Sequence, residues 1–191
     1  VHRRVALFSD VTEKKRRDEL TWRHANFDML TDLPNRRMFH DRLRQEMIKT
    51  QRSGSKLVLL FLDLDRFKDV NDTLGHDKGD VLLAQVALRI IGCVRESDTV
   101  ARLGGDEFTV ILTEIVELDS VERVSQAIID ALSQPFHLGA DVAEISASVG
   151  IAVYPTDSID AAQLLNMADQ AMYSAKSAGR SRFGYYLAQR A

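Results

Sequence analysis

Cysteine is nearly absent from this chain of 191 residues, because Cys93 is the only one. A single cysteine excludes an internal disulfide and a cysteine-rich metal site, and it fits a reducing compartment. Long apolar runs are missing too, since the longest, 57–62, is far below the roughly 18–20 residues that span a bilayer. No signal-peptide pattern is visible. We therefore expect a cytoplasmic domain without membrane contact of its own, whether or not a longer protein around it carries a membrane anchor.

Neither sign of charge dominates the chain, which has 25 Lys and Arg, 28 Asp and Glu, and a formal net charge of −3. This balance argues against a nucleic-acid-binding protein that relies on a basic surface. The hydrophobic share of 45% and the charged share of 28% are ordinary for a globular protein that buries a core. The length suits one domain with an appendage, and a first residue Val1 instead of Met predicts a piece of something longer.

The N-terminal stretch is typical of the end of another unit followed by a connecting helix. Residues 1–8 have the pattern of a short strand, and Asp10 or Thr12 could cap a helix that runs towards Asp28. Apolar positions in that helix are sparse, which favours a linker helix over a core helix; they are Leu20, Trp22 and Phe27. A solvated, partly frayed terminus is the alternative interpretation.

Apolar periodicity predicts the remaining elements. The continuous apolar run 57–62 is typical of a central strand covered on both faces. Gly104 and Gly105 predict a hairpin turn, and the stretch containing Asn71 and Gly75 is expected to be a loop. The predicted helices are 35–53, 81–94, 120–133 and 160–178, and the predicted strands are 57–62, 99–103, 108–112, 142–154 and 183–187. Their order is the βαββαβ pattern of a ferredoxin-like α+β core, with a central, mainly antiparallel sheet flanked by helices.

Three acidic residues follow predicted strands or turns. Asp63 comes directly after the apolar run, and Asp106 and Glu107 come directly after the glycine turn. If the hairpin lies beside the central strand, Asp63 and Asp106 can converge and would need a cation between them, for which Mg²⁺ is suited. Two such ions could activate a 3′-hydroxyl and stabilise a pyrophosphate leaving group. A turn or cap aspartate at 63 and a plain hairpin turn remain the alternatives.

Polar residues elsewhere fit the recognition of a nucleotide. Asp80 could accept hydrogen bonds from guanine N1–H and N2–H₂, and the amide of Asn71 offers both a donor and an acceptor. Lys176 and Arg180 are four residues apart near a predicted helix end and could hold phosphates. No G-x-x-x-x-G-K-[ST] loop is present, so phosphates are not held in the P-loop manner. A loop residue or helix cap, and a solvated helix face, are the respective alternatives.

These motifs together resemble the GGDEF family of diguanylate cyclases, named after the residues that stand here as 104–108. Several spaced blocks occur in the family's order over 28–185, which makes chance agreement improbable. They are 28–37, 63–72, 75–80, 101–108, 148–152 and 168–180. The resemblance implies the fold of nucleotidyl cyclase and polymerase palm domains. It also implies an enzyme that condenses two GTP molecules into cyclic di-GMP, with release of pyrophosphate, as a homodimer.

The resemblance implies a role for each matched residue. Asp63 and Asp106 would ligate Mg²⁺ or Mn²⁺ with help from the Leu64 carbonyl, and Glu107 would assist the metal or deprotonate the 3′-hydroxyl. Substrate-binding residues would be Phe67, Lys68, Asn71, Asp80, Gly104, Gly105, Lys176 and Arg180. None of the matched catalytic positions is degenerate, so we expect activity instead of a vestigial domain.

An Arg-x-x-Asp pattern lies nine residues before the glycine turn, at Arg95 and Asp98. The family has a product-inhibition site there, which implies feedback by bound cyclic di-GMP; a surface Arg–Asp pair ending a helix is the alternative. The expected division is the end of a PAS-like sensor with a linker helix over 1–27, the cyclase domain over 28–187 and a tail over 188–191.

Three other functions compete with the cyclase. The first is a catalytically silent GTP-binding module that controls an adjacent phosphodiesterase domain. The second is an effector that binds cyclic di-GMP only through the Arg-x-x-Asp pattern. The third is a cyclase that uses ATP, which Asp80 disfavours because adenine lacks the donors that its carboxylate would accept.

Overall fold

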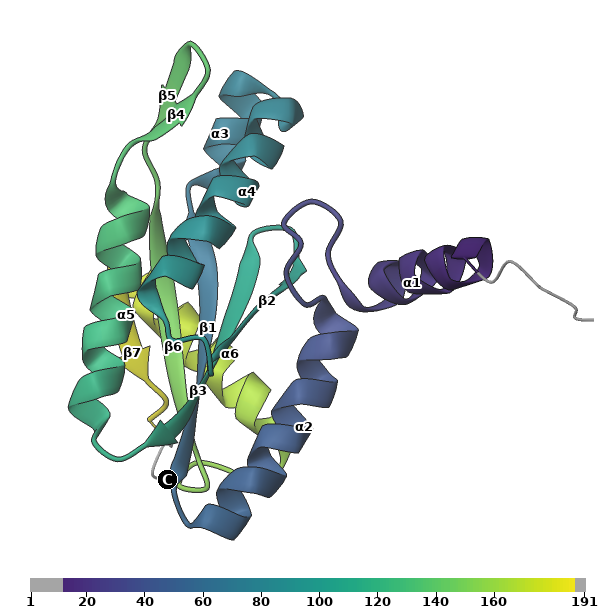
Figure 1. The fold of residues 1–191 in the computed structure, drawn as a ribbon. Coiled ribbons are helices and arrows are strands. Elements are labelled where there is room, and N and C mark those ends of the chain that lie inside the picture. The colour runs from purple at the N-terminus through teal and green to yellow at the C-terminus, as the bar shows by residue number, and fades with distance from the viewer. Residues whose placement is uncertain (1–11, 188–191) are drawn as a thin grey trace, which may run out of the picture.

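Helices cover both faces of one five-stranded sheet in the computed structural model, which describes residues 12–187 (Figure 1). The elements in chain order are α1 (Thr12–Asn26), α2 (Arg36–Ser53), β1 (Lys56–Asp65), α3 (Phe67–Leu74), α4 (His76–Cys93), β2 (Thr99–Gly104), β3 (Glu107–Ile115), α5 (Leu118–Ser133), β4 (Phe136–Leu138), β5 (Asp141–Ala143), β6 (Ser146–Tyr154), α6 (Ala161–Ser177) and β7 (Arg182–Tyr185).

The sheet has the order β2-β3-β1-β6-β7. Strand β1 runs antiparallel to both β3 and β6, β2 runs antiparallel to β3, and only β7 is parallel to its neighbour β6. The first four strands, with the crossovers through α4 and α5, make the ferredoxin-like arrangement, and α6 with β7 extends it at one edge. The predicted fold class, a mainly antiparallel sheet flanked by helices, is therefore confirmed.

Strand β1 is buried on both faces, which explains its continuous apolar run. Its odd-numbered side chains pack in a cluster with α2 and α6, and its even-numbered ones pack with α4 and α5. All six residues of the run are at most 5% exposed; they are Leu57, Val58, Leu59, Leu60, Phe61 and Leu62. Because this strand lies in the middle of the sheet, the residues that follow the apolar run, 63–65, lie in the centre of the domain.

The strand continues past the apolar run, so the prediction that it ends before Asp63 was wrong. Asp63 pairs with Glu107 of β3 on one side and with Ser148 of β6 on the other. The loop predicted after the strand was wrong as well, because α3 and α4 fill it. Helix α3 buries only Phe67 and Val70, too few apolar positions to show a helical period.

The predicted strand 142–154 is divided in the structure. A short hairpin of β4 and β5 turns at Gly139, which has a φ of +80°, and β6 begins only at Ser146. Strands of three residues are too short to show an alternating pattern, so this hairpin was missed. The strand expected over 1–8 and the cap at Asp10 lie outside the described residues.

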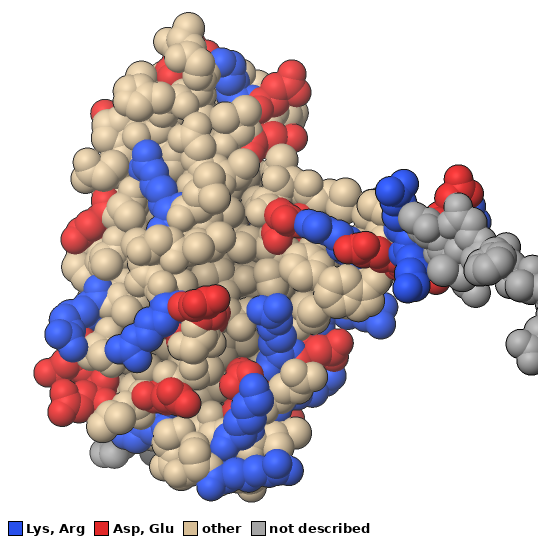
Figure 2. Space-filling model, in the orientation of Figure 1, with Lys and Arg blue, Asp and Glu red and all other residues tan. Residues whose placement is uncertain are grey.

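Helix α1 extends away from the body of the domain (Figure 1). Leu20 and Trp22 are 57% and 52% exposed, and charged side chains crowd around the helix (Figure 2). The linker function of this helix stays a prediction. None of the helices within 12–187 combines the length and apolar character needed to cross a bilayer.

Candidate active site

The site forms where the end of β1 meets the hairpin between β2 and β3. Gly104 and Gly105 make the turn with φ values of +145° and +53°, a region that favours glycine. The turn brings the backbone carbonyl of Asp106 within 3.3 Å of the Leu64 N–H, which donates to it. The hairpin carboxylates and the strand carboxylate Asp63 therefore come from segments that are held together by main-chain contacts.

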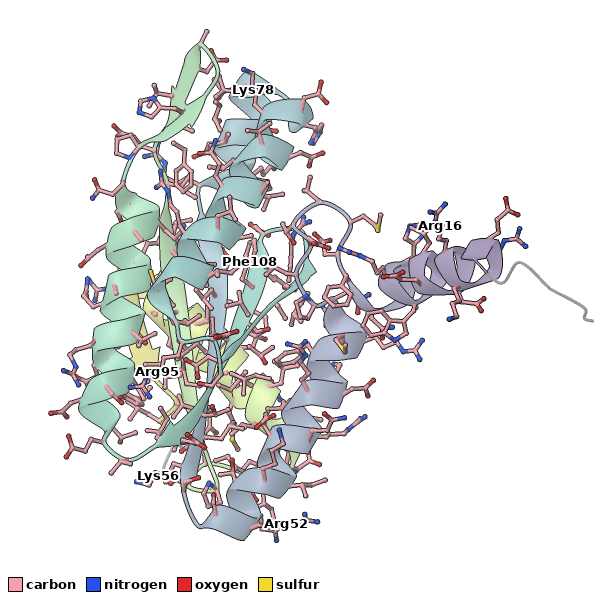
Figure 3. The ribbon with its side chains drawn as sticks, in the orientation of Figure 1. Arg16, Arg52, Lys56, Lys78, Arg95 and Phe108 are labelled. Carbon is pink, nitrogen blue, oxygen red and sulfur yellow. The ribbon has the colours of Figure 1, made fainter. Side chains whose placement is uncertain are left out.

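A partly buried ion pair supports the hairpin from below. Arg102 donates through Nη1 to both carboxylate oxygens of Asp28 at 3.0 and 3.1 Å, and through Nε and Nη2 to the Gly105 carbonyl at 3.0 and 2.7 Å. Burial raises the pKa of Asp28, but hydrogen bonds from Thr31 and Arg102 outweigh it, so this pKa lies below its ordinary value. Phe108, which directly follows the hairpin acids in sequence and is labelled in Figure 3, is fully buried in the core.

Asp63 is half-buried and carries a close cation. Lys176 Nζ of α6 lies 2.5 Å from Asp63 Oδ1. Burial is the largest influence on the pKa of Asp63 and raises it; the Lys176 hydrogen bond opposes this, and repulsion from Asp106 adds to it. Burial and the neighbouring carboxylates together outweigh Lys176, so the pKa of Asp63 lies above its ordinary value.

Glu107 lies in the same negative field. Its pKa is raised first by burial and then by the carboxylates of Asp169, Asp106 and Asp63, while Arg36 lowers it. Arg36 Nη2 lies 3.3 Å from Glu107 Oε2. Neither Arg36 nor Asp169 received a role from the sequence, although both lie inside the matched blocks, because only tertiary structure brings α2 and α6 to the hairpin.

The donors at this point suit a hard divalent cation. Carboxylate and carbonyl oxygens are the ligands that Mg²⁺ and Mn²⁺ prefer, and Asp63, Asp106 and Leu64 supply them. Burial is the main cause of the raised pKa of Asp63, and repulsion from Asp106 adds to it; a cation between the two carboxylates would relieve that repulsion. Within residues 12–187 no group of three or more His, Cys, Asp and Glu side chains is placed to hold a metal alone. The donor set therefore fits a cation that substrate phosphates and waters also ligate.

The residues expected to bind guanine lie on two consecutive helices. Asn71 of α3 is half-buried and Asp80 of α4 is exposed. Phe67, at the start of α3, is only 8% exposed and belongs to the core, whereas Lys68 beside it is exposed.

Two residues expected to bind phosphates, Lys176 and Arg180, lie near the end of β1 but come from different segments. Helix α6 ends at Ser177, so the prediction that Lys176 and Arg180 share a helix face was wrong. Arg180 lies in the following turn with a φ of +61°, and its Nε is 3.9 Å from Asp65 Oδ1. Asp65 is fully buried and accepts hydrogen bonds from two hydroxyls of β6 and from one backbone N–H of the turn; the donors are Ser146, Ser148 and Ser181.

The Arg-x-x-Asp pattern lies at the opposite end of α4 from Asp80. Asp98 accepts backbone hydrogen bonds at both carboxylate oxygens, from Arg95 N–H at 3.0 Å and Thr113 N–H at 3.1 Å. Arg95, which is labelled in Figure 3, is exposed. No ion pair in the described part of the chain joins its side chain to that of Asp98. Both residues line a cavity of about 380 Å³ between the end of α4 and α5.

Strands β1, β2, β3 and β6 and the glycine hairpin lie inside a match to a known protein family. Residues 25–182 match the family described as diguanylate cyclase, GGDEF domain. The chain belongs to the GGDEF family.

Two curated relatives come from Pseudomonas aeruginosa. MucR, named a bifunctional diguanylate cyclase/cyclic di-GMP phosphodiesterase, is 45% identical over 162 residues, which are 85% of this chain and 24% of MucR. TpbB, named a diguanylate cyclase, is 43% identical over 157 residues, which are 82% of this chain and 36% of TpbB. The chain thus spans about a quarter to a third of these relatives. Two further relatives are named as cyclic di-GMP phosphodiesterases.

Solved structures agree with this membership. The GGDEF domain of TpbB superposes with a TM-score of 0.82 at 41% identity, covering 84% of this chain and 94% of that chain. The coiled coil and GGDEF domain of DgcB from Caulobacter crescentus, in complex with cyclic di-GMP, superposes with a TM-score of 0.81 at 30% identity and covers 92% and 93%.

Proposed function

We propose that this chain is a diguanylate cyclase that condenses two GTP molecules into cyclic di-GMP and releases pyrophosphate. The observation that carries the proposal is the cluster of Asp63, Asp106 and Glu107 at the meeting point of β1 and the glycine hairpin. The raised pKa values of Asp63 and Glu107 support it, because burial and, to a lesser degree, neighbouring carboxylates raise them at the point where a cation and a triphosphate would bind.

Asp63, Asp106 and the Leu64 carbonyl would hold Mg²⁺ or Mn²⁺. When bound, the cation activates the attacking 3′-hydroxyl and neutralises the departing pyrophosphate. Glu107 would assist the cation or accept the proton of the 3′-hydroxyl, and burial, by raising its pKa, makes this carboxylate a stronger base than usual.

The remaining matched residues would bind GTP. Asn71 and Asp80 would form hydrogen bonds with the guanine edge. The Asp80 carboxylate would select guanine over adenine, because adenine lacks the donors that it would accept. The hairpin glycines, Gly104 and Gly105, would let the backbone approach the nucleotide. Lys68, Lys176 and Arg180 would contact the phosphates. Phe67 would belong to the substrate site from the core, where it is only 8% exposed.

A single chain carries one such set, so two chains must face each other across a two-fold axis to close the cyclic product. Helix α1 would be the linker that controls this homodimer. In this proposal 1–27 is the end of a PAS-like sensor with its linker, 28–187 is the catalytic domain and 188–191 is a tail. We further propose a cytoplasmic location, without contacts to nucleic acid or to a membrane by this part of the protein.

Product would bind in the cavity beside Arg95 and inhibit the enzyme. The exposed guanidinium of Arg95 is available to a guanine or a phosphate, and Asp98 shapes the turn that presents it. The DgcB structure with cyclic di-GMP supports the general ability of GGDEF domains to bind this product.

The alternative is a silent GTP-binding module that regulates a phosphodiesterase domain, and it is favoured by the relatives that carry that name. The test fuses the chain to a dimerising coiled coil and compares wild type with Asp106→Ala plus Glu107→Ala. Cyclic di-GMP is measured by chromatography and GTP binding by calorimetry. Product from the wild type alone supports the cyclase, whereas GTP binding without product from the forced wild-type dimer supports the regulatory module.

A further inference from the structure

Helix α4 contains two glycines, although glycine is among the poorest helix formers. Both lie within the helix and neither has a positive φ, so the backbone conformation requires glycine at neither position. They differ in their surroundings: a Cβ at Gly92 would meet nothing within 4 Å, whereas a Cβ at Gly79 would lie 1.9 Å from Asn71 Oδ1 and 3.0 Å from Asn71 Cγ. The space that a side chain at position 79 would occupy is therefore filled by the amide of Asn71.

This contact is built by the junction of α3 and α4. The Gly75 N–H donates to the Asn71 carbonyl at 2.9 Å, and the Gly79 N–H donates to the Gly75 carbonyl at 3.2 Å. The Asn71 amide thus lies against the first turn of α4, where Gly79 is buried and the next residue, Asp80, is exposed.

We infer that Gly79 is a positioning residue for guanine recognition, because its missing side chain seats the Asn71 amide beside Asp80. This inference rests on the proposed function, in which Asn71 and Asp80 bind guanine. The next atom near the hypothetical Cβ is Phe67 Cζ at 3.4 Å, an ordinary contact. An alanine at position 79 therefore conflicts with one side chain only, and the flexible end of that side chain can rotate away.

Rotation of the Asn71 amide would preserve the fold but move its donor and acceptor away from the guanine. The guanine edge would then lack one of its hydrogen-bond partners. A site that loses such a hydrogen bond binds its ligand more weakly and discriminates less between bases. Gly79→Ala should therefore act on the affinity for GTP and on base selectivity more than on the chemical step.

The experiment measures initial rates of the coiled-coil-fused chain with GTP, and with inosine triphosphate, which lacks the exocyclic amino group. We expect Gly79→Ala to raise the KM for GTP roughly tenfold, the size of one lost hydrogen bond, and to reduce the preference for GTP, with little change in kcat. Gly92→Ala is the matched control, since it makes the same change in the same helix without a contact. We expect it to retain the wild-type KM and a melting temperature at or above that of the wild type.

A second background separates positioning from a general packing defect. In Asn71→Ala the conflicting amide is gone, so adding Gly79→Ala should change neither KM nor selectivity further, and it should not lower the melting temperature. A wild-type KM and preference in Gly79→Ala, or a full additional loss on the Asn71→Ala background, would overturn the inference. Wild-type GTP binding by Asn71→Ala would instead overturn the guanine role on which the inference rests.

Discussion

Lys176 Nζ of α6 lies 2.5 Å from Asp63 Oδ1 of β1, so the ammonium group occupies one side of the strand carboxylate that is proposed to hold the cation. The two residues are 113 positions apart in sequence, so the pair joins β1 to a much later helix. In the proposed function, the pair would place a cation for the phosphates next to a carboxylate for the metal, as binding of a metal–triphosphate complex needs.

The first prediction concerns the pKa of Asp63. Burial and Asp106 raise it, so the folded state holds this proton more tightly than the unfolded chain does. This contribution to stability is present below the unfolded pKa and is lost as the pH rises through the folded pKa. Carbon NMR titration of the metal-free protein should therefore give a midpoint above that of an ordinary aspartate. In Asp106→Asn the midpoint should fall, and an unchanged midpoint would contradict the proposed repulsion.

The second prediction concerns the response to a divalent cation. Mg²⁺ at ten times its dissociation constant should raise the melting temperature of the wild type by about 3–5 °C. The reason is that the carboxylate pair exists only in the folded protein, so the cation stabilises the folded over the unfolded state. Asp106→Ala should show no such shift in differential scanning calorimetry. Equal shifts in both proteins would place the cation elsewhere.

The third prediction concerns the ion pair beneath the hairpin. The side chains of Arg102 and Asp28 are only 10% and 23% exposed, so Arg102→Ala leaves a partly buried carboxylate without its partner and should cost about 3 kcal/mol of unfolding free energy. Arg44→Ala removes an exposed pair with Asp41 and should stay within about 0.5 kcal/mol of the wild type. Urea unfolding of both variants measures the difference, and similar losses would argue against a supporting role of Arg102.

The fourth prediction concerns feedback by product. Arg95→Ala should abolish inhibition by cyclic di-GMP and leave the melting temperature unchanged, because the side chain is exposed. Asp98→Ala should lower the melting temperature as well, since its carboxylate holds the backbone N–H groups of Arg95 and Thr113. Progress curves with and without added cyclic di-GMP measure the inhibition. Persistent inhibition of Arg95→Ala would contradict the proposed site.

Strong local patterns predicted most of the fold, and the misses have physical causes. The doubly buried β1 was evident from its apolar run, but its continuation to Asp65 depends on pairing with β3 and β6, which outlasts the apolar residues. Helix α3 has too few buried side chains to show a period. The hairpin of β4 and β5 is too short to show one.

The site was partly predictable for the same reason. Asp63 and Asp106 are conspicuous because acidic residues follow a buried strand and a glycine turn. Arg36 and Asp169 are ordinary charged residues on helices, and only the packing of α2 and α6 against the sheet brings them to Glu107. The seat of the Asn71 amide over Gly79 likewise depends on how α3 meets α4, which no spacing in the sequence reveals.

The measurement that tests the central claim most directly is Mg²⁺-dependent formation of cyclic di-GMP from GTP by the coiled-coil-fused chain, with Asp63→Asn and Asp106→Asn as near-isosteric variants. The account predicts product from the wild type only when Mg²⁺ is present, and a loss of at least about a hundredfold in each variant, because each removes a charged oxygen from the cation. Product at the wild-type rate from either variant, or from the wild type without a divalent cation, would contradict it.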